Sequence, residues 1–256
     1  MIDILSKTFN NLELILGIQD GIEVKAVVAC NEDRHEYPNA NYFASPIFDF
    51  LAIFNHSHIV TDHLNIEVLQ QGFWMTYKTA FLVALRSKGD DFKFRAKELT
   101  LRVKLKVCEF FEMMEKMDPA MLRKLTISRF HMNKRTALEF AKTPVWANLE
   151  EFAISTYVTV PLKHFFDLKT YSVVLRDVTP QELFEAVQNV LQHKKGEFKI
   201  QLFRGFRFEE HIQWLLTIHG ARMAETEPKV VITQDDRIFE VRTSSGLGIV
   251  RCKIVL

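Results

Sequence analysis

The chain has 256 residues, of which 48% are hydrophobic and 25% are charged, as in an ordinary soluble globular protein. Its formal net charge is +1, so its overall charge favours neither nucleic acid nor an anionic membrane as a partner. We expect a cytoplasmic or nuclear protein outside the membrane. No apolar run reaches the about 20 residues of a membrane span, and the three cysteines form no C-x-x-C motif.

The first forty residues predict a short helix followed by a small antiparallel meander. Residues 1–9 have helical spacing, residues 12–18 and 22–29 are β-like runs, and residues 35–37 supply a third strand. The Asp20-Gly21 step predicts a tight turn, because glycine accepts positive φ. We therefore separate residues 1–40, packed on the remainder, from residues 41–256, with both parts forming one continuous structural unit.

Helices and strands alternate in the next eighty residues. Spacing predicts helices over residues 46–54, 73–86 and 104–117, and a strand over residues 64–68. The last of these helices ends at Asp118-Pro119, because proline disfavours a helical residue before it.

A short pattern, apolar-x-x-apolar-x-apolar, organises the chain from residue 96 onward. It is found at residues 96–101, 122–127, 149–154 and 168–173, with a related run at residues 198–202. Aligning Leu99, Leu125, Phe152, Tyr171 and Ile200 gives spacings of 26, 27, 19 and 29 residues, and leucine-rich repeats have periods of about 20–29 residues. One strand and one helix cannot bury their apolar sides alone, so such units stack on their neighbours.

The predicted fold is therefore α/β. We expect a degenerate leucine-rich-repeat-like arc of strand–helix units, with the N-terminal meander at one end and a β-rich cap at the other. Trp146, three residues before Leu149, is expected to be buried between repeats. The alternative is an ordinary α/β domain with a parallel sheet.

The clearest predicted helix begins after Val178. Thr179 at the N-cap, Pro180 at the first helical position and Glu182 form a capping box, and Gly196 ends the helix. A second helix is expected over residues 208–218. A hairpin is expected between residues 238–242 and 249–255, with its turn at residues 244–246.

Few residues suggest catalysis. His56, His58, Asp62 and His63 are residue types that ligate zinc, and a metal-dependent hydrolase using this cluster is an open alternative. We expect these side chains not to converge, because their spacing departs from known metal motifs. Cys108 lies on the apolar side of a predicted helix, where it is expected to be a small buried hydrophobic residue. We therefore predict no enzymatic activity, no metal and no cofactor.

A second alternative is RNA binding through short basic clusters. These are Arg123-Lys124, Lys134-Arg135 and His193-Lys194-Lys195. They are scattered and lack interleaved aromatic residues, so we do not expect a nucleic-acid partner.

Several segments resemble a known family. Thr143-Pro-Val-Trp146-Ala-Asn-Leu149, Pro161-Leu-Lys-His164-Phe165-Phe166 and Asp177-Val-Thr-Pro-Gln-Glu-Leu183 are similar to segments of the FTH-domain family, an F-box-associated family expanded in nematodes. Residues 12–37 resemble the stretch that follows the F-box in its members. The resemblance implies a substrate-recruiting adaptor of a cullin–RING ubiquitin ligase. Residues 1–11 are too few for an F-box, so we expect binding to the Skp adaptor subunit only if an F-box is supplied.

The expected function is that of a non-enzymatic protein-interaction module with an unknown target protein. Its binding face would consist of the strand positions that alternate with the buried ones. These positions are Glu98, Thr100, Arg102, Lys124, Thr126, Ser128, Glu151, Ala153, Ser155, Thr170, Ser172, Val174, Lys199, Gln201 and Phe203.

Overall fold

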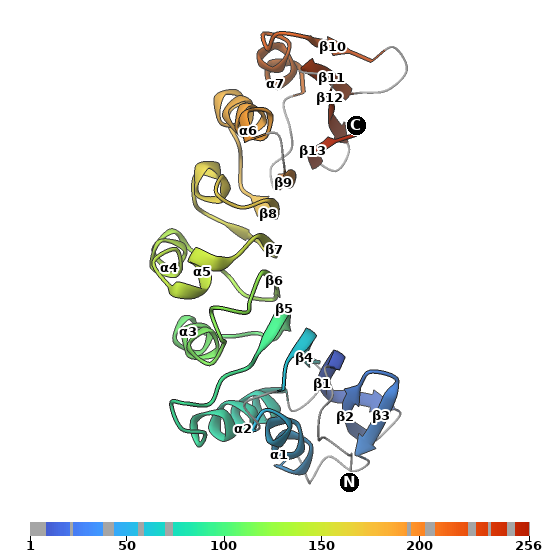
Figure 1. Cartoon of the computed structure of the whole chain (residues 1–256), viewed down its shortest axis with the longest axis vertical. Coiled ribbons are helices and arrows are strands. Elements are labelled where there is room, and N and C mark those ends of the chain that lie inside the picture. Colours follow the sequence, from blue (N-terminus) through green and yellow to red (C-terminus); the bar gives the residue numbers. More distant parts are fainter. Residues whose placement is uncertain are drawn as a thin grey trace. The chain divides into compact units, whose positions relative to one another are not determined.

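The computed structural model describes residues 9–20, 23–37, 44–55, 59–69, 74–193, 196–202, 208–224, 229–234, 237–244 and 249–255. The chain is α/β, as the sequence predicts, and divides into two compact units. Unit 1 comprises Met1–Phe130 and Phe140–Leu149, and unit 2 comprises His131–Glu139 and Glu150–Leu256. Each unit has its own run of neighbouring strands with both parallel and antiparallel pairs (Figure 1).

The strands of unit 1 follow the order β3-β2-β1-β4-β5-β6. Their bounds are β1 (Phe9–Asp20), β2 (Glu23–Cys30), β3 (Asp33–Tyr37), β4 (Thr61–Val68), β5 (Ala96–Arg102) and β6 (Lys124–Ser128). β1, β2 and β3 form the predicted antiparallel meander, whereas β1 pairs in parallel with β4, and β4, β5 and β6 are parallel to one another. The meander is therefore joined to the parallel strands through β1. Residues 1–8 of the expected N-terminal helix lie outside the described residues, and Phe9 begins β1.

Helices α1 (Ala44–Ile53), α2 (Trp74–Arg86) and α3 (Val107–Glu115) lie to one side of the strands of unit 1 (Figure 1). The strands bury alternate apolar side chains, including Leu64, Leu99 and Leu125, which are at most 1% exposed. Polar residues occupy the intervening positions of β4, β5 and β6. This period of two leaves the opposite side of the sheet polar.

Aromatic rings fill much of the core of unit 1. The ring of Phe110 in α3 stacks on Phe130 at 4.6 Å and meets Phe140 edge-on at 5.0 Å between ring centroids. A second group joins Phe54 to Phe94 at 4.9 Å. These rings, supplied by segments distant in the sequence, fix the helices against the strands.

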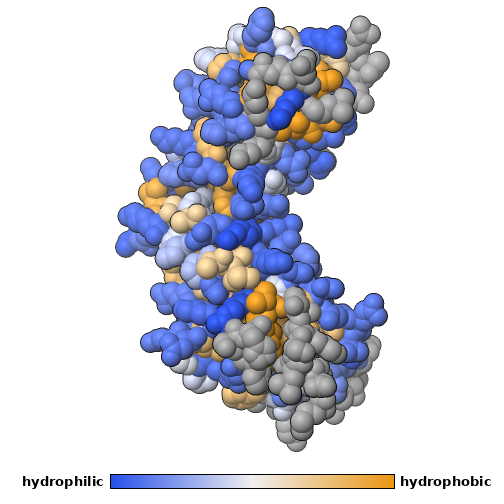
Figure 2. All heavy atoms as spheres, in the orientation of Figure 1, coloured by the Kyte–Doolittle hydropathy of each residue, from blue (hydrophilic) through white to orange (hydrophobic). Residues whose placement is uncertain are grey.

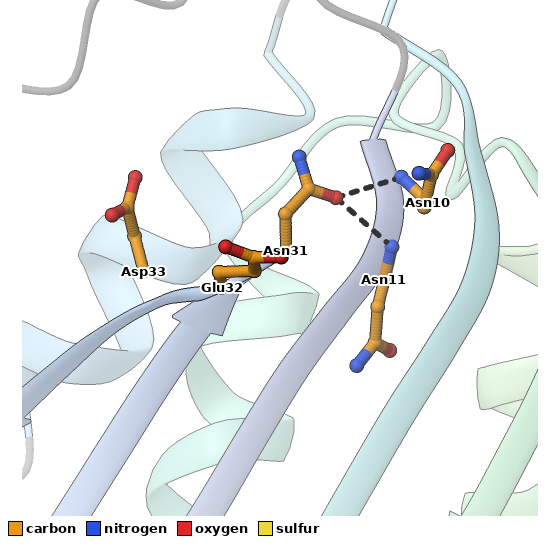
Figure 3. A pocket seen from close by; sticks show the side chains of 5 residues that line it. All are labelled: Asn10, Asn11, Asn31, Glu32 and Asp33. Carbon is orange, nitrogen blue, oxygen red and sulfur yellow. Dashed lines mark hydrogen bonds between the residues drawn. The ribbon is translucent and has the colours of Figure 1, made fainter.

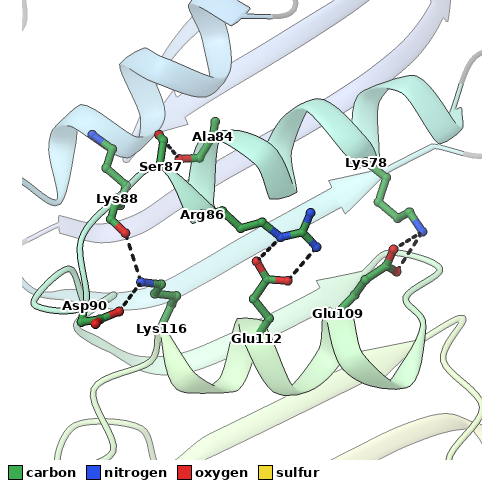
Figure 4. Close-up of polar contacts among 9 residues, drawn as sticks. All are labelled: Lys78, Ala84, Arg86, Ser87, Lys88, Asp90, Glu109, Glu112 and Lys116. Carbon is green, nitrogen blue, oxygen red and sulfur yellow. Dashed lines mark hydrogen bonds and ion pairs between the residues drawn. The ribbon is translucent and has the colours of Figure 1, made fainter.

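Charged side chains join α2 to α3 (Figure 4). The ammonium group of Lys78 donates to both carboxylate oxygens of Glu109 at 3.0 and 2.8 Å, and these two side chains are 3% and 11% exposed. Burial raises the pKa of Glu109, but the backbone N–H of Lys106 and the Lys78 ammonium outweigh that effect and lower it. Nearer solvent, Arg86 forms a bidentate pair with Glu112 at 2.7 and 2.9 Å.

The strands of unit 2 follow the order β7-β8-β9-β13-β12-β11-β10. Their bounds are β7 (Glu151–Val158), β8 (Thr170–Leu175), β9 (Glu197–Leu202), β10 (Ala221–Met223), β11 (Lys229–Gln234), β12 (Arg237–Ser244) and β13 (Ile249–Ile254). β7, β8 and β9 are parallel, and the remaining neighbours are antiparallel. The predicted hairpin between β12 and β13 is confirmed, and residues 245–248 of its turn lie outside the described residues.

Three helical elements follow strands of unit 2: the 3₁₀ helix η2 (Leu162–Phe165), α6 (Pro180–His193) and α7 (Phe208–Leu215). A further short helix, α4 (Lys134–Phe140), belongs to unit 2 except for its last residue. The strand–helix units expected from the sequence require a helix after β7, but only the short 3₁₀ element η2 occurs before β8 begins.

The capping box at the start of α6 is confirmed. The hydroxyl oxygen of Thr179 accepts from the backbone N–H of Glu182 at 3.2 Å, and the Glu182 carboxylate accepts from the backbone N–H of Thr179 at 3.0 Å. After the helix, Gly196 has a φ of +99°, where a Cβ atom would lie 2.3 Å from the carbonyl oxygen of Lys169. Glycine is therefore required at this position.

Removal of the Thr179 side-chain oxygen is expected to destabilise α6. Thr179→Ala should lower the free energy of unfolding by about 0.5–2 kcal/mol, because the N–H of Glu182 loses its acceptor. Chemical denaturation followed by circular dichroism measures this loss. Thr179→Ser retains the oxygen and should remain close to the original stability; equal losses in both variants would contradict the capping explanation.

Two details of the repeat prediction are wrong. Tyr171 pairs with Phe198 and Val173 pairs with Ile200, so the last alignment is displaced by two residues. That displacement leaves each side chain on the same side of the strand. Trp146 is not fully buried: it lies in α5 (Pro144–Asn148) with its ring 5.3 Å from Phe140, and its neighbour Val145 is the buried residue, at 4% exposure.

Candidate functional site

Three rows of side chains cross the side of β1, β4, β5 and β6 that lies opposite their apolar positions. We call this surface the unit 1 face. The first row is Asn11, His63, Glu98 and Lys124; the second is Glu13, Asn65, Thr100 and Thr126; the third is Ile15, Glu67, Arg102 and Ser128. All six predicted binding positions in β5 and β6 belong to these rows. Apart from the exposed His63 and Arg102, the side chains are half-buried by their neighbours.

Opposite charges are paired within the rows. The carboxylate of Glu98 lies 3.0 Å from Nδ1 of His63 and 3.3 Å from Nζ of Lys124, so one carboxylate bridges three strands. In the third row, Arg102 lies 3.3 Å from Glu67. Such cross-strand pairs are worth roughly 0.2–1 kcal/mol each and hold the side chains in place. The result is an ordered polar surface with both signs of charge.

Arg129 lies beside the carboxyl ends of these strands. Its backbone has a φ of 64°, an uncommon conformation for a residue with a Cβ atom. Its guanidinium group donates to the backbone carbonyl of Val68 at 3.0 Å. The side chain thereby ties the end of β6 to the end of β4. Sequence reasoning missed this residue, and no local pattern marks it.

The corresponding face of unit 2 is formed by β7, β8 and β9. One row contains Glu151, Thr170 and Glu197, a second contains Ala153, Ser172 and Lys199, and a third contains Tyr157, Val174 and Gln201. The predicted position Ser155 is exposed and lies in the irregular part of the β7–β8 pairing. Phe203, the last predicted position, lies outside the described residues.

The proposed metal cluster is only partly described. His56 and His58 lie outside the described residues, His63 is paired with Glu98, and Asp62 lies 2.7 Å from Nζ of Lys97. Over the described ranges, no group of three or more histidine, cysteine, aspartate or glutamate side chains could hold a metal ion.

The expectation of a buried Cys108 is wrong. Its thiol lies on the exposed side of α3, because that helix buries Glu109, Phe110, Met113 and Met114 instead.

His164 lies half-buried in η2, where burial, and then the charges of Lys163 and Lys134, lower the pKa of its imidazole.

Basic clusters chosen from the sequence make contacts within the fold. The guanidinium group of Arg123 donates to the carbonyl of Ala120 at 2.8 Å, Lys124 pairs with Glu98, and Arg135 pairs with Glu139 at 2.9 Å. Lys194 and Lys195 lie outside the described residues. Three of these basic side chains are therefore engaged locally.

A shallow depression of about 480 Å³ lies at the end of the meander, lined by Asn10, Asn11, Asn31, Glu32 and Asp33 (Figure 3). The side-chain oxygen of Asn31 accepts from the backbone N–H groups of Asn10 and Asn11 at 2.8 and 3.2 Å. Asn31 itself has a φ of 55°, which asparagine tolerates better than most residues. These contacts close the β1–β2 end and give the Asn31 side chain a structural role.

Comparison of the chain with protein-family models, curated proteins and solved structures finds no match. None of the described helices is long and apolar enough to cross a membrane. Hydrophilic residues cover most of the surface turned to the viewer in each unit, with smaller hydrophobic areas between them (Figure 2).

Proposed function

We propose that this chain is a non-enzymatic protein-interaction module that binds its target through the polar strand faces. The observation that carries the proposal is the register of the parallel strands. Glu98, Thr100 and Arg102 lie directly opposite Lys124, Thr126 and Ser128. Side chains from separate segments thus form one continuous surface of mixed charge, which a protein partner can contact along several strands at once.

The proposal includes a leucine-rich-repeat-like arrangement of strand–helix units. Two pairings support it: Leu99 lies opposite Leu125, and Phe152 lies opposite Tyr171, as the repeat alignment requires. In repeat proteins of this kind, exposed strand positions commonly provide the binding surface. The degenerate arc expected from the sequence remains a prediction.

We further propose that the target is recruited for ubiquitination. Support comes from the resemblance of residues 143–149, 161–166 and 177–183 to the FTH-domain family. In this proposal the described fold supplies target recognition, and an F-box provides the contact with the Skp adaptor subunit.

Selection of peptides from a displayed library against the purified full chain tests the binding proposal. Selected peptides should lose at least tenfold in affinity for a variant with Thr100→Arg and Thr126→Arg, which places two bulky cations in the centre of the unit 1 face. A matched control, Thr79→Arg with Ala52→Arg, adds the same charge at exposed positions of α2 and α1.

Fluorescence anisotropy with each selected peptide gives the affinities. An equal loss of affinity in the unit 1 variant and the control would show that the added positive charge weakens binding wherever it is placed, and would contradict binding at the unit 1 face. Failure to select any peptide, or binding that neither a unit 1 variant nor a matching Ser155→Arg and Ser172→Arg variant disturbs, would overturn the proposed function.

A further inference from the structure

A row of basic side chains crosses four neighbouring strands of unit 2. Lys199 of β9 lies opposite Arg251 of β13, Arg251 lies opposite Arg242 of β12, and Arg242 lies opposite Lys229 of β11. We call these four residues the basic row. Directly opposite residues project from the same side of a sheet, and neighbouring strands lie about 4.8 Å apart, so the row is about 14 Å long.

The basic row continues the face already assigned to unit 2. Ser172 of β8 lies opposite Lys199, so the row begins where the predicted binding positions end. Arg242 and Arg251 are exposed, whereas Lys199 is half-buried. The sequence did not reveal this row, because its members are up to 52 residues apart and come from strands with no common repeat.

One buried carboxylate compensates part of this charge. Glu240 lies 3.0 Å from Nζ of Lys229 and 2.9 Å from the guanidinium group of Arg242. The hydrogen bond from Lys229, followed by the contact with Arg242, lowers the pKa of Glu240 despite its burial. Within the described ranges, no carboxylate forms an ion pair with Lys199 or Arg251. Lys199 and Arg251 lie directly opposite each other, and like charges in this arrangement are destabilising. A carboxylate bound between these two side chains would relieve that repulsion.

The surroundings of the row favour an acidic peptide over nucleic acid. The neighbouring row on the same face contains Glu197 of β9, which lies opposite Thr170, and Glu240 of β12, which lies opposite Lys253. These carboxylates make the positive stripe narrow, whereas nucleic acid needs a broad basic footprint. The described members of both rows include no aromatic ring on which a base could stack.

We propose that the basic row binds an acidic peptide segment of the target protein. This inference rests on the proposed function and names the chemistry of its partner. Aspartate or glutamate side chains of the segment pair with Arg251, whose guanidinium group can engage both oxygens of a carboxylate, and with the neighbouring Lys199. Charge complementarity of this kind also raises the association rate of the peptide and the protein at low salt concentration.

Binding of a fluorescein-labelled octaglutamate peptide to the full chain tests the inference. Fluorescence anisotropy at low ionic strength should detect binding that weakens as sodium chloride is added. A variant with Lys199→Gln and Arg251→Gln should bind at least tenfold more weakly. A control with Lys163→Gln and Arg176→Gln removes the same charge from exposed positions outside the row and should change the affinity less than twofold.

Several outcomes would overturn the acidic-peptide inference. These are absence of octaglutamate binding, equal loss in the two double variants, or tighter binding of a labelled single-stranded RNA of equal charge that depends on Lys199 and Arg251. Library-selected peptides without acidic residues that still depend on the unit 2 face would leave the proposed function intact while excluding this inference. Thermal melting of each variant confirms that it remains folded.

Discussion

Replacement of Lys78 by alanine is expected to lower the free energy of unfolding by about 3–5 kcal/mol, because it leaves the Glu109 carboxylate buried without its counter-charge. Lys78 is 3% exposed, so water cannot replace the missing ammonium group without opening the contact between α2 and α3. Urea denaturation at neutral pH, followed by circular dichroism, measures the change.

The neighbouring ion pair supplies the control. Arg86 also forms a bidentate contact with Glu112, but its side chain is 54% exposed. Arg86→Ala should therefore destabilise the protein far less than Lys78→Ala, because a solvated ion pair contributes little to stability. A double variant, Lys78→Met with Glu109→Gln, should recover most of the stability. Equally small losses of stability in Lys78→Ala and Arg86→Ala would show that burial of the Lys78–Glu109 pair does not determine its contribution.

The same pair gives unit 1 a defined response to acid. The folded protein lowers the pKa of Glu109, so the carboxylate contributes stability that is fully present above its unfolded pKa, about 4.3. That contribution is lost as the pH falls through the folded pKa. The difference in stability between the original protein and Glu109→Gln should consequently shrink in acid.

Phe110→Ala is expected to have an effect of similar size, a loss of about 3–5 kcal/mol. The ring is 0% exposed and contacts Phe130 and Phe140, so its removal leaves a cavity among side chains held by different elements. Urea denaturation again provides the measurement. Phe48→Ala removes a ring that is 49% exposed and should lower the free energy of unfolding much less. Comparable losses in the two variants would show that neighbouring side chains fill the cavity left by Phe110.

Local sequence signals were sufficient for many elements. The alternation of residues in the meander predicted its three strands, and Thr179, Pro180 and Glu182 marked the start of α6 because capping is a local property of the chain. The same Thr-Pro signal at Thr143 and Pro144 marks the start of α5. In this helix the backbone N–H of Trp146 donates a hydrogen bond to the hydroxyl oxygen of Thr143 at 3.3 Å. That helix was missed because five residues are too few to show an apolar stripe.

Strand partners could not be predicted in the same way. Period-two alternation tells which side of a strand is buried, but it does not choose a neighbour. Nothing near Leu14 indicates that β1 pairs with Ile66 of β4, 52 residues later. Glu98 was predicted to lie on the binding face, yet its contact with His63 depends on the pairing of β4 with β5. The basic row likewise depends on strand pairing, because β9 pairs with β13 rather than with β10.

The position of β13 also affects the order in which the chain can fold during synthesis. β13 (Ile249–Ile254) lies between β9 and β12, although β10, β11 and β12 are made before it. A ribosome adds about 5–20 residues each second, and earlier segments begin to fold as they emerge. Strands β10 to β12 can form a hairpin array at that stage, but β9 keeps an open edge until residues 249–254 arrive. The nascent chain thus exposes a pairing edge on β9 that a chaperone, or another copy of the same segment, can reach before translation is complete.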